Sequence, residues 1–206
     1  MSVITCRSNM LRGVSELARQ RPAEELYNYI GGRTGAWEVT ELTANHGSPL
    51  ARVSHLDITN GPLERIPAST VWVLQGLVRS TRHVIREEHE TRDSKRRNGM
   101  AEATCAALIP IRKSAAWWAL DKLARLEMTQ LSSWSGLPGQ QFLSAVVRRL
   151  QNGRDLSGQF DEVTWFEYAP RDASVFNDLL AAWRASDEWK YVERDCDMRL
   201  TRVEHP

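Results

Sequence analysis

Hydrophobic and polar residues alternate along two short segments in the first third of the chain. Residues 35–43 (GAWEVTELT) and 51–59 (ARVSHLDIT) change between apolar and polar at most positions, and β-branched and aromatic residues are common in both. This alternation is typical of strands that bury one face. The longer apolar stretch 71–85 is predicted to be a third strand, and turn sequences containing Gly, Pro and Asn separate the three.

The first thirty residues show a different pattern. Apolar residues recur at helical spacing over 8–20, a proline can open a second short helix over 22–30, and the two glycines directly after it would end that helix. We therefore expect a helical N-terminal extension over 1–30. Residues 31–206 are then expected to form one domain.

The rest of the chain alternates between apolar strands and amphipathic helices, after a highly charged segment, 86–99, that is typical of a solvated helix or loop. Pro110 is expected to close the first of the later strands. The resulting order, βββαβααβαβ, is that of an α+β protein with an antiparallel sheet, and it is compatible with two ferredoxin-like halves forming one barrel. The strands are expected at 103–112, 162–169 and 188–203, and the helices at 113–131, 141–151 and 172–186.

Composition narrows the class of protein without indicating a reaction. A chain of 206 residues, 42% of them hydrophobic, can bury one substantial core, and a net charge of +1 argues against a dedicated nucleic-acid binder. Three cysteines with no CxxC spacing indicate a reducing compartment, and no apolar run is long enough to span a bilayer. We therefore expect a cytoplasmic protein with no membrane partner. Trp supplies eight of the aromatic residues, which suits a pocket as well as a core.

Few residues indicate chemistry by their spacing alone, because the chain has no phosphate-binding loop and no hydrolase or zinc-protease motif. His83 and Glu87 would share one face of a helix as possible metal ligands. On a strand they would lie about 13 Å apart and could not bind one ion. Arg148 lies opposite the apolar stripe of the helix predicted there, so the pattern alone makes it a surface residue.

Three longer segments give a more specific indication. They are ATCAALIPIRKSAAWW, FDEVTWFEYAP and RASDEWKYVERDCDMRLTR. These segments closely resemble the chlorite dismutase family, especially its short, dimeric subgroup, and weaker similarity extends over roughly 31–203. The resemblance implies a dimeric α+β barrel of two ferredoxin-like halves that usually holds heme b in its C-terminal half. Enzymes of this family split chlorite into chloride and dioxygen, and related members bind heme or take part in heme synthesis.

The resemblance also assigns roles to individual residues. Lys113 matches a lysine beside a heme propionate, and Trp117 and Trp118 match the tryptophan pair that follows it. Arg148 matches the mobile arginine on the distal side of the heme. Glu188 matches the glutamate that hydrogen-bonds the proximal histidine.

The proximal histidine itself is missing. Its position falls on Ser135, and Trp134 beside it could fill part of the space of a porphyrin. A tyrosine on the propionate side is replaced by His83. An imidazole oriented by a carboxylate is a strong axial ligand to iron, whereas a serine hydroxyl is a very weak one.

Three hypotheses follow. The first is a diverged oxidoreductase-type enzyme that works without histidine-ligated heme b on another small substrate, with Arg148 and Glu188 as catalytic residues. In this case a non-heme metal could bind His83 together with Glu188 or Glu87. The second is a heme b-dependent oxidoreductase that decomposes chlorite or peroxide and uses another axial ligand. The third is a non-catalytic binding module. The resemblance to the short subgroup implies that the protein is a homodimer.

Overall fold

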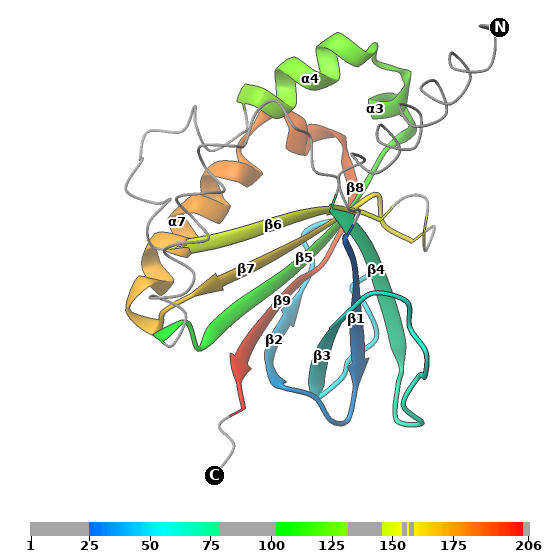
Figure 1. The fold of residues 1–206 in the computed structure, drawn as a ribbon. Helices are drawn as coiled ribbons and strands as arrows, with labels where there is room; N and C mark the ends of the chain where they lie inside the picture. Colours follow the sequence, from blue (N-terminus) through cyan, green and yellow to red (C-terminus); the bar gives the residue numbers. More distant parts are fainter. Residues whose placement is uncertain (1–24, 79–101, 132–145, 154–155, 157–158, 204–206) are drawn as a thin grey trace, which may run out of the picture.

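A single sheet organises the molecule. The computed structural model describes residues 25–78, 102–131, 146–153, 156 and 159–203. Within these ranges nine strands follow the order β7-β6-β4-β1-β3-β2-β9-β5-β8. Strand β7 also pairs with β5, so the sheet closes into a barrel and β8 extends from the end of β5 (Figure 1).

The first half of the barrel contains only strands in the part that the structure describes. The strands predicted near 35–43, 51–59 and 71–85 are confirmed as β2, β3 and β4, although the end of the third lies outside the described residues. Their bounds, with those of β1, are β1 (Glu25–Gly32), β2 (Trp37–Thr43), β3 (His55–Asn60) and β4 (Trp72–Val78).

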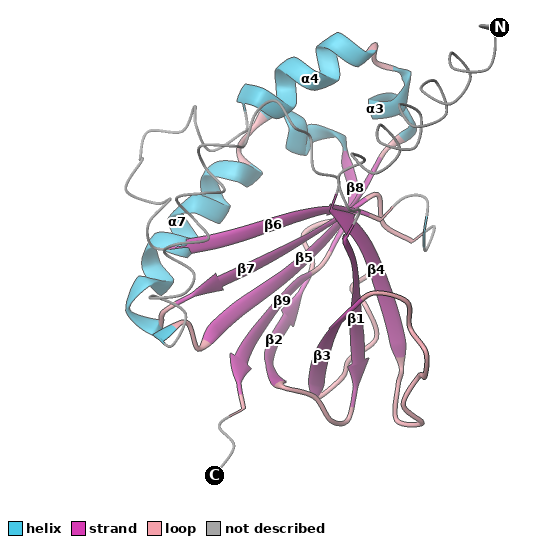
Figure 2. Cartoon of the chain, viewed as in Figure 1, coloured by secondary structure: helices cyan, strands magenta, loops and turns pink. Residues whose placement is uncertain are grey.

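The second half combines strands with helices. Its strands are β5 (Cys105–Lys113), β6 (Val146–Asn152), β7 (Glu162–Tyr168), β8 (Val192–Asp195) and β9 (Asp197–Arg202). Its helices are α3 (Ala115–Ala119), α4 (Lys122–Leu131) and α7 (Ala173–Arg184), with short 3-10 turns η2 (Pro170–Asp172) and η3 (Asp187–Tyr191). The helices gather along one side of the barrel (Figure 2).

The two halves repeat one topology. In the first half the spatial order is β4-β1-β3-β2, and in the second it is β9-β5-β7-β6. Both orders place the fourth strand beside the first and the third beside the second, which is the ferredoxin-like arrangement. The predicted α+β barrel of two such halves is therefore confirmed.

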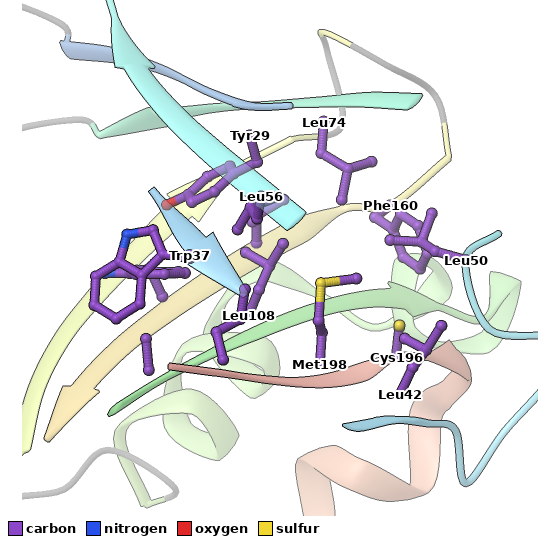
Figure 3. Close-up of a cluster of buried hydrophobic side chains, with 14 of the residues drawn as sticks. Tyr29, Trp37, Leu42, Leu50, Leu56, Leu74, Leu108, Phe160, Cys196 and Met198 are labelled. Carbon is purple, nitrogen blue, oxygen red and sulfur yellow. The ribbon is translucent and has the colours of Figure 1, made fainter. Parts of the chain in front are cut away.

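The barrel interior is the larger of two hydrophobic cores. Tyr29, Leu56, Leu74 and Leu108 are fully buried there, together with Trp165 (Figure 3). The Trp37 ring meets the Trp165 ring edge-on with centroids 5.2 Å apart, a favourable geometry for aromatic pairs. Side chains thus fill the inside of the barrel.

The second core lies between the sheet and α7. Phe176, Leu179, Leu180 and Trp183 are the buried residues of α7 and recur at helical spacing. They pack against outward-facing side chains of β5 and β7 such as Phe166. Strands β5 and β7 are therefore buried on both faces, which explains their nearly continuous apolar sequences, whereas β2 alternates because only one of its faces is covered.

Two predicted helices are strands in the structure. The helix expected over 22–30 is wrong from Glu25 on, because β1 pairs with both β3 and β4. The barrel thus begins at Glu25 at the latest, and residues 1–24 lie outside the described residues. The helix expected over 141–151 is wrong from Val146 on, because β6 pairs with β7 along its whole length.

Three other boundaries also differ. The helix predicted over 113–131 is two helices, because Leu120 has an extended backbone and the Asp121 carboxylate caps α4 by accepting the Ala124 N–H at 2.8 Å. Strand β5 continues past Pro110 to Lys113. The strand predicted over 188–203 is η3 followed by β8 and β9. Among the described residues, no helix has both the length and the apolar character needed to cross a bilayer.

The barrel core provides a direct test of the fold. Leu108→Ala should lower the free energy of unfolding by about 2–5 kcal/mol, because it leaves a cavity at a fully buried position. Leu123→Ala removes the same atoms from a side chain that is 64% exposed and should change it by no more than about 0.5 kcal/mol. Urea denaturation followed by circular dichroism measures both, and equal losses would contradict the barrel described here.

Candidate functional site

A buried ion pair lies where β5 ends. Lys113 is the last residue of β5, and its Nζ lies 2.5 Å from Glu188 Oε1. The Lys113 and Glu188 side chains are only 0% and 5% exposed. Two charges so far from water persist only if they compensate each other. The structure therefore brings together two of the residues that the resemblance singled out.

Trp117 completes this cluster from the first helix after β5. The Lys113 ammonium lies 4.3 Å from the centroid of the Trp117 ring, a cation–π distance. The other neighbour of this ring is Tyr191, at 5.5 Å between centroids. The ammonium is thus held by a carboxylate and an aromatic face.

The turn that carries Glu188 is anchored at both ends. Trp189 packs edge-on against Trp183 of α7, with centroids 4.9 Å apart. At the other end, the Ser114 N–H donates to the Tyr191 carbonyl at 2.7 Å and ties η3 to the start of α3. Glu188 therefore has a fixed position relative to Lys113.

Arg148 belongs to the same half of the barrel. It lies on β6, where its partner across the ladder is Phe166 of the outer core. The helix on which the helical-wheel interpretation of Arg148 was based is replaced by a strand. Two residues further along, Leu150 is 42% exposed. Its ladder partner Thr164 has a buried hydroxyl that makes no hydrogen bond within the part of the chain that the structure describes.

Trp118 occupies a separate position beside Trp117. Its ring lies 5.5 Å from the Arg125 guanidinium, and Arg125 donates to the Trp118 carbonyl. Trp118 also lines a cavity of about 450 Å³ that borders the end of β5. Trp117 therefore contacts the ion pair, whereas Trp118 lines the cavity.

The remaining predicted site residues lie outside the described residues. They are Ser135 and Trp134, at the position of the axial ligand, and His83 and Glu87, the possible metal ligands. In the part that the structure describes, no three His, Cys, Asp or Glu side chains are arranged to hold a metal ion.

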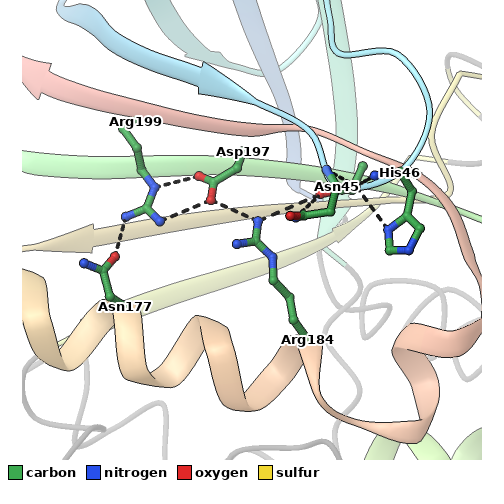
Figure 4. A network of polar contacts seen from close by, with 7 residues as sticks. Asn45, His46, Asn177, Arg184, Asp197 and Arg199 are labelled. Carbon is green, nitrogen blue, oxygen red and sulfur yellow. Dashed lines mark hydrogen bonds and ion pairs between the residues drawn. The ribbon is translucent and has the colours of Figure 1, made fainter.

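A second polar cluster was not predicted. Asp195 is fully buried and accepts the backbone N–H groups of Asn45 at 3.0 Å and His46 at 2.6 Å. Asp197 accepts hydrogen bonds from Arg184 at 2.9 Å and from Arg199 at 2.6 Å (Figure 4). The network links the β2–β3 loop, the β8–β9 corner and α7. The sequence signal for it is the RDCDMR segment, whose acidic residues lie within buried strands.

The pKa values of one residue of this network and of two residues near it are shifted. Burial alone would lower the pKa of Arg199, but its hydrogen bonds to Asp197 raise it. Burial raises the pKa of the Tyr168 phenol and raises that of the Cys196 thiol to about 11. The Tyr168 phenol and the Cys196 thiol therefore both stay neutral near pH 7.

Fold and site define a barrel of two ferredoxin-like halves whose second half holds a buried lysine–glutamate pair beneath helices. The chain is similar to the dimeric chlorite dismutase from Nitrobacter winogradskyi, with 39% identity, a TM-score of 0.71, and coverage of 86% of this chain and 99% of that one. It therefore belongs to the chlorite dismutase family.

More distant solved structures support the fold alone. A mutant chlorite dismutase from Candidatus Nitrospira defluvii has 16% identity and a TM-score of 0.57, with coverage of 87% of this chain and 92% of that one. The chlorite dismutase from the same organism in complex with imidazole has 16% identity and a TM-score of 0.54, with coverage of 86% and 91%. No protein-family model and no curated protein matches the chain.

The buried ion pair can be tested by removing one partner and then both. Lys113→Met should lower the free energy of unfolding by about 3–5 kcal/mol, because Glu188 then keeps a buried charge without its lysine. Adding Glu188→Leu should recover most of this loss. Urea denaturation of the single and double variants measures it.

The matched control is Lys190→Met, which breaks the exposed pair with Asp187 and should leave the unfolding midpoint unchanged. A Lys113→Met protein as stable as the parent would contradict a desolvated pair.

Proposed function

We propose that this chain is a diverged, oxidoreductase-type member of the chlorite dismutase family that works without histidine-ligated heme b and acts on another small substrate. The observation that carries the proposal is the state of Glu188. Its carboxylate is bound by Lys113, while the sequence position that would supply its histidine partner is Ser135.

The positions of the described histidines support a chain that works without histidine-ligated heme. The two histidines among them are His46, which faces Asp195, and His55, whose ring contacts Ser54 on β3. His46 and His55 thus contact Asp195 and Ser54, whereas Lys113 binds the Glu188 carboxylate. A serine hydroxyl is a very weak iron ligand. No step of the proposed chemistry is therefore assigned to heme.

Arg148 is the proposed substrate-binding residue. A guanidinium is charged at every physiological pH and has a planar fork of donors, which suits a small oxyanion. Leu150, two positions further along β6, is 42% exposed, which supports access to this strand from solvent. Arg148 would bind the anion and stabilise negative charge that develops on it.

Glu188 is the proposed proton-transfer group. Lys113 fixes one of its oxygens and keeps the carboxylate in place, and Trp117 in turn packs on Lys113. A non-heme metal held by His83 with Glu188 or Glu87 is a further part of the proposal. We also propose a homodimer, because the similar Nitrobacter winogradskyi protein is dimeric.

The heme prediction is tested by the absorption spectrum and metal content of protein purified from a heme-replete host. We expect no Soret band and less than about 0.1 heme per chain, because serine binds iron very weakly. Ser135→His should create a Soret band by restoring an imidazole. Ser133→His, two residues away, should not.

Stoichiometric heme in the unchanged protein would overturn the proposal in favour of a heme-dependent oxidoreductase. Oxygen evolution from chlorite would then be the activity to measure. Stoichiometric iron, manganese or zinc without a Soret band would support the non-heme metal instead.

The role of Arg148 is tested with chlorite and nitrite as probe anions. Isothermal titration should detect binding that Arg148→Ala weakens at least about tenfold, since the charge-assisted hydrogen bonds are lost. Arg149→Ala, at the next position of β6, is the matched control and should keep the affinity. Equal affinity in all three proteins would point to a non-catalytic barrel.

A further inference from the structure

The cavity beside Trp118 is a second candidate binding site. It has a volume of about 450 Å³, within the range of small-molecule sites. Four parts of the chain meet there: the end of β5, helix α3, the two residues before β7, and strand β8. The residues that line it are Arg112, Lys113, Ala115, Trp118, Phe160, Asp161 and Glu193.

Two opposite charges on its wall form an exchangeable pair. Arg112 Nε lies 2.8 Å from Glu193 Oε1, and the two side chains are 50% and 44% exposed. An ion pair this accessible to water contributes little to stability. A ligand can therefore separate the two groups at small cost if it supplies a new partner for each.

The third charge of the lining is fixed. The Asp161 carboxylate accepts the Lys113 backbone N–H at 2.7 Å, and the Asp161 N–H donates to the Ile111 carbonyl at 2.9 Å. The Lys113 ammonium is bound to Glu188, so it is not the cation of this cavity. The lining thus presents one guanidinium and two carboxylates.

The apolar part of the lining consists of two aromatic rings. Phe160 is a member of the barrel core and only 1% exposed, and Trp118 comes from α3. The Phe160 ring lies 4.7 Å from the Arg194 guanidinium, which is itself held by the Ser48 carbonyl. Trp118, which is partly exposed, therefore offers the accessible apolar surface of the lining to a ligand side chain.

We infer that this cavity binds a small zwitterion, namely a free α-amino acid with an apolar side chain. The ligand carboxylate replaces Glu193 as the partner of Arg112, and the ligand ammonium binds the Glu193 carboxylate. The ligand side chain packs on Trp118. A ligand with only one charge would leave Arg112 or Glu193 without a partner. The inference does not depend on the proposed function.

The experiment compares three probes that share one side chain. Isothermal titration with phenylalanine should show saturable binding. Phenethylamine, which lacks the carboxylate, and 3-phenylpropanoate, which lacks the ammonium, should each bind at least about tenfold more weakly, because each makes only one of the two charge-assisted contacts. No binding of phenylalanine, or equal binding of all three probes, would overturn the inference.

Variants locate the site. Arg112→Gln and Glu193→Gln should each reduce phenylalanine affinity at least about tenfold, and Arg112→Lys should restore part of it. The matched control is Lys190→Gln, at an exposed ion pair elsewhere on the surface, which should bind like the parent. Circular dichroism checks folding. Unchanged affinity in both Arg112→Gln and Glu193→Gln would also overturn the inference, and none of these outcomes bears on heme content or on Arg148.

Discussion

The pairing of β7 with both β5 and β6 is the constraint on which the rest of the structure depends. It closes the ring of strands, and side chains fill the interior of that ring. It also places β5 and β7 in the middle of the second half, with the barrel core on one face and α7 on the other. Lys113 at the end of β5 is therefore cut off from water. The ion pair of Lys113 and Glu188 is the consequence of that burial.

The strands with one covered face could be predicted from the sequence, because alternation is a local signal. Residues 37–43 and 55–60 are such strands. Residues 146–152 were predicted as a helix because their apolar residues also fit helical spacing. The pairing of β6 with β7 decides the conformation there, and that pairing is a tertiary interaction which a short window of sequence does not contain. The same applies to 25–32, which pairs on both sides with distant strands.

The candidate site was predictable in its residues but not in its contacts. Similarity to a family named Lys113, Trp117 and Glu188, yet nothing in residue types or spacing indicated that the lysine binds the carboxylate 75 positions later. The network of Asp195 and Asp197 was missed for a physical reason. Acidic residues in a strand are usually taken as solvent-facing, and only the structure supplies the partly buried guanidinium groups and the backbone N–H donors that compensate them.

The two halves of the barrel share a strand order but differ in their connections. In the first half, residues 33–36 and 61–71 join the strands without any helix, whereas in the second half the corresponding connections include α3, α4 and α7. Among the described residues, the first half thus contributes only sheet, whereas the second half contributes sheet and a layer of helices. Sequence inserted into the 61–71 connection would extend from the half without helices and leave the helix-covered half intact. This loop is therefore the natural place to attach a probe or a fused domain.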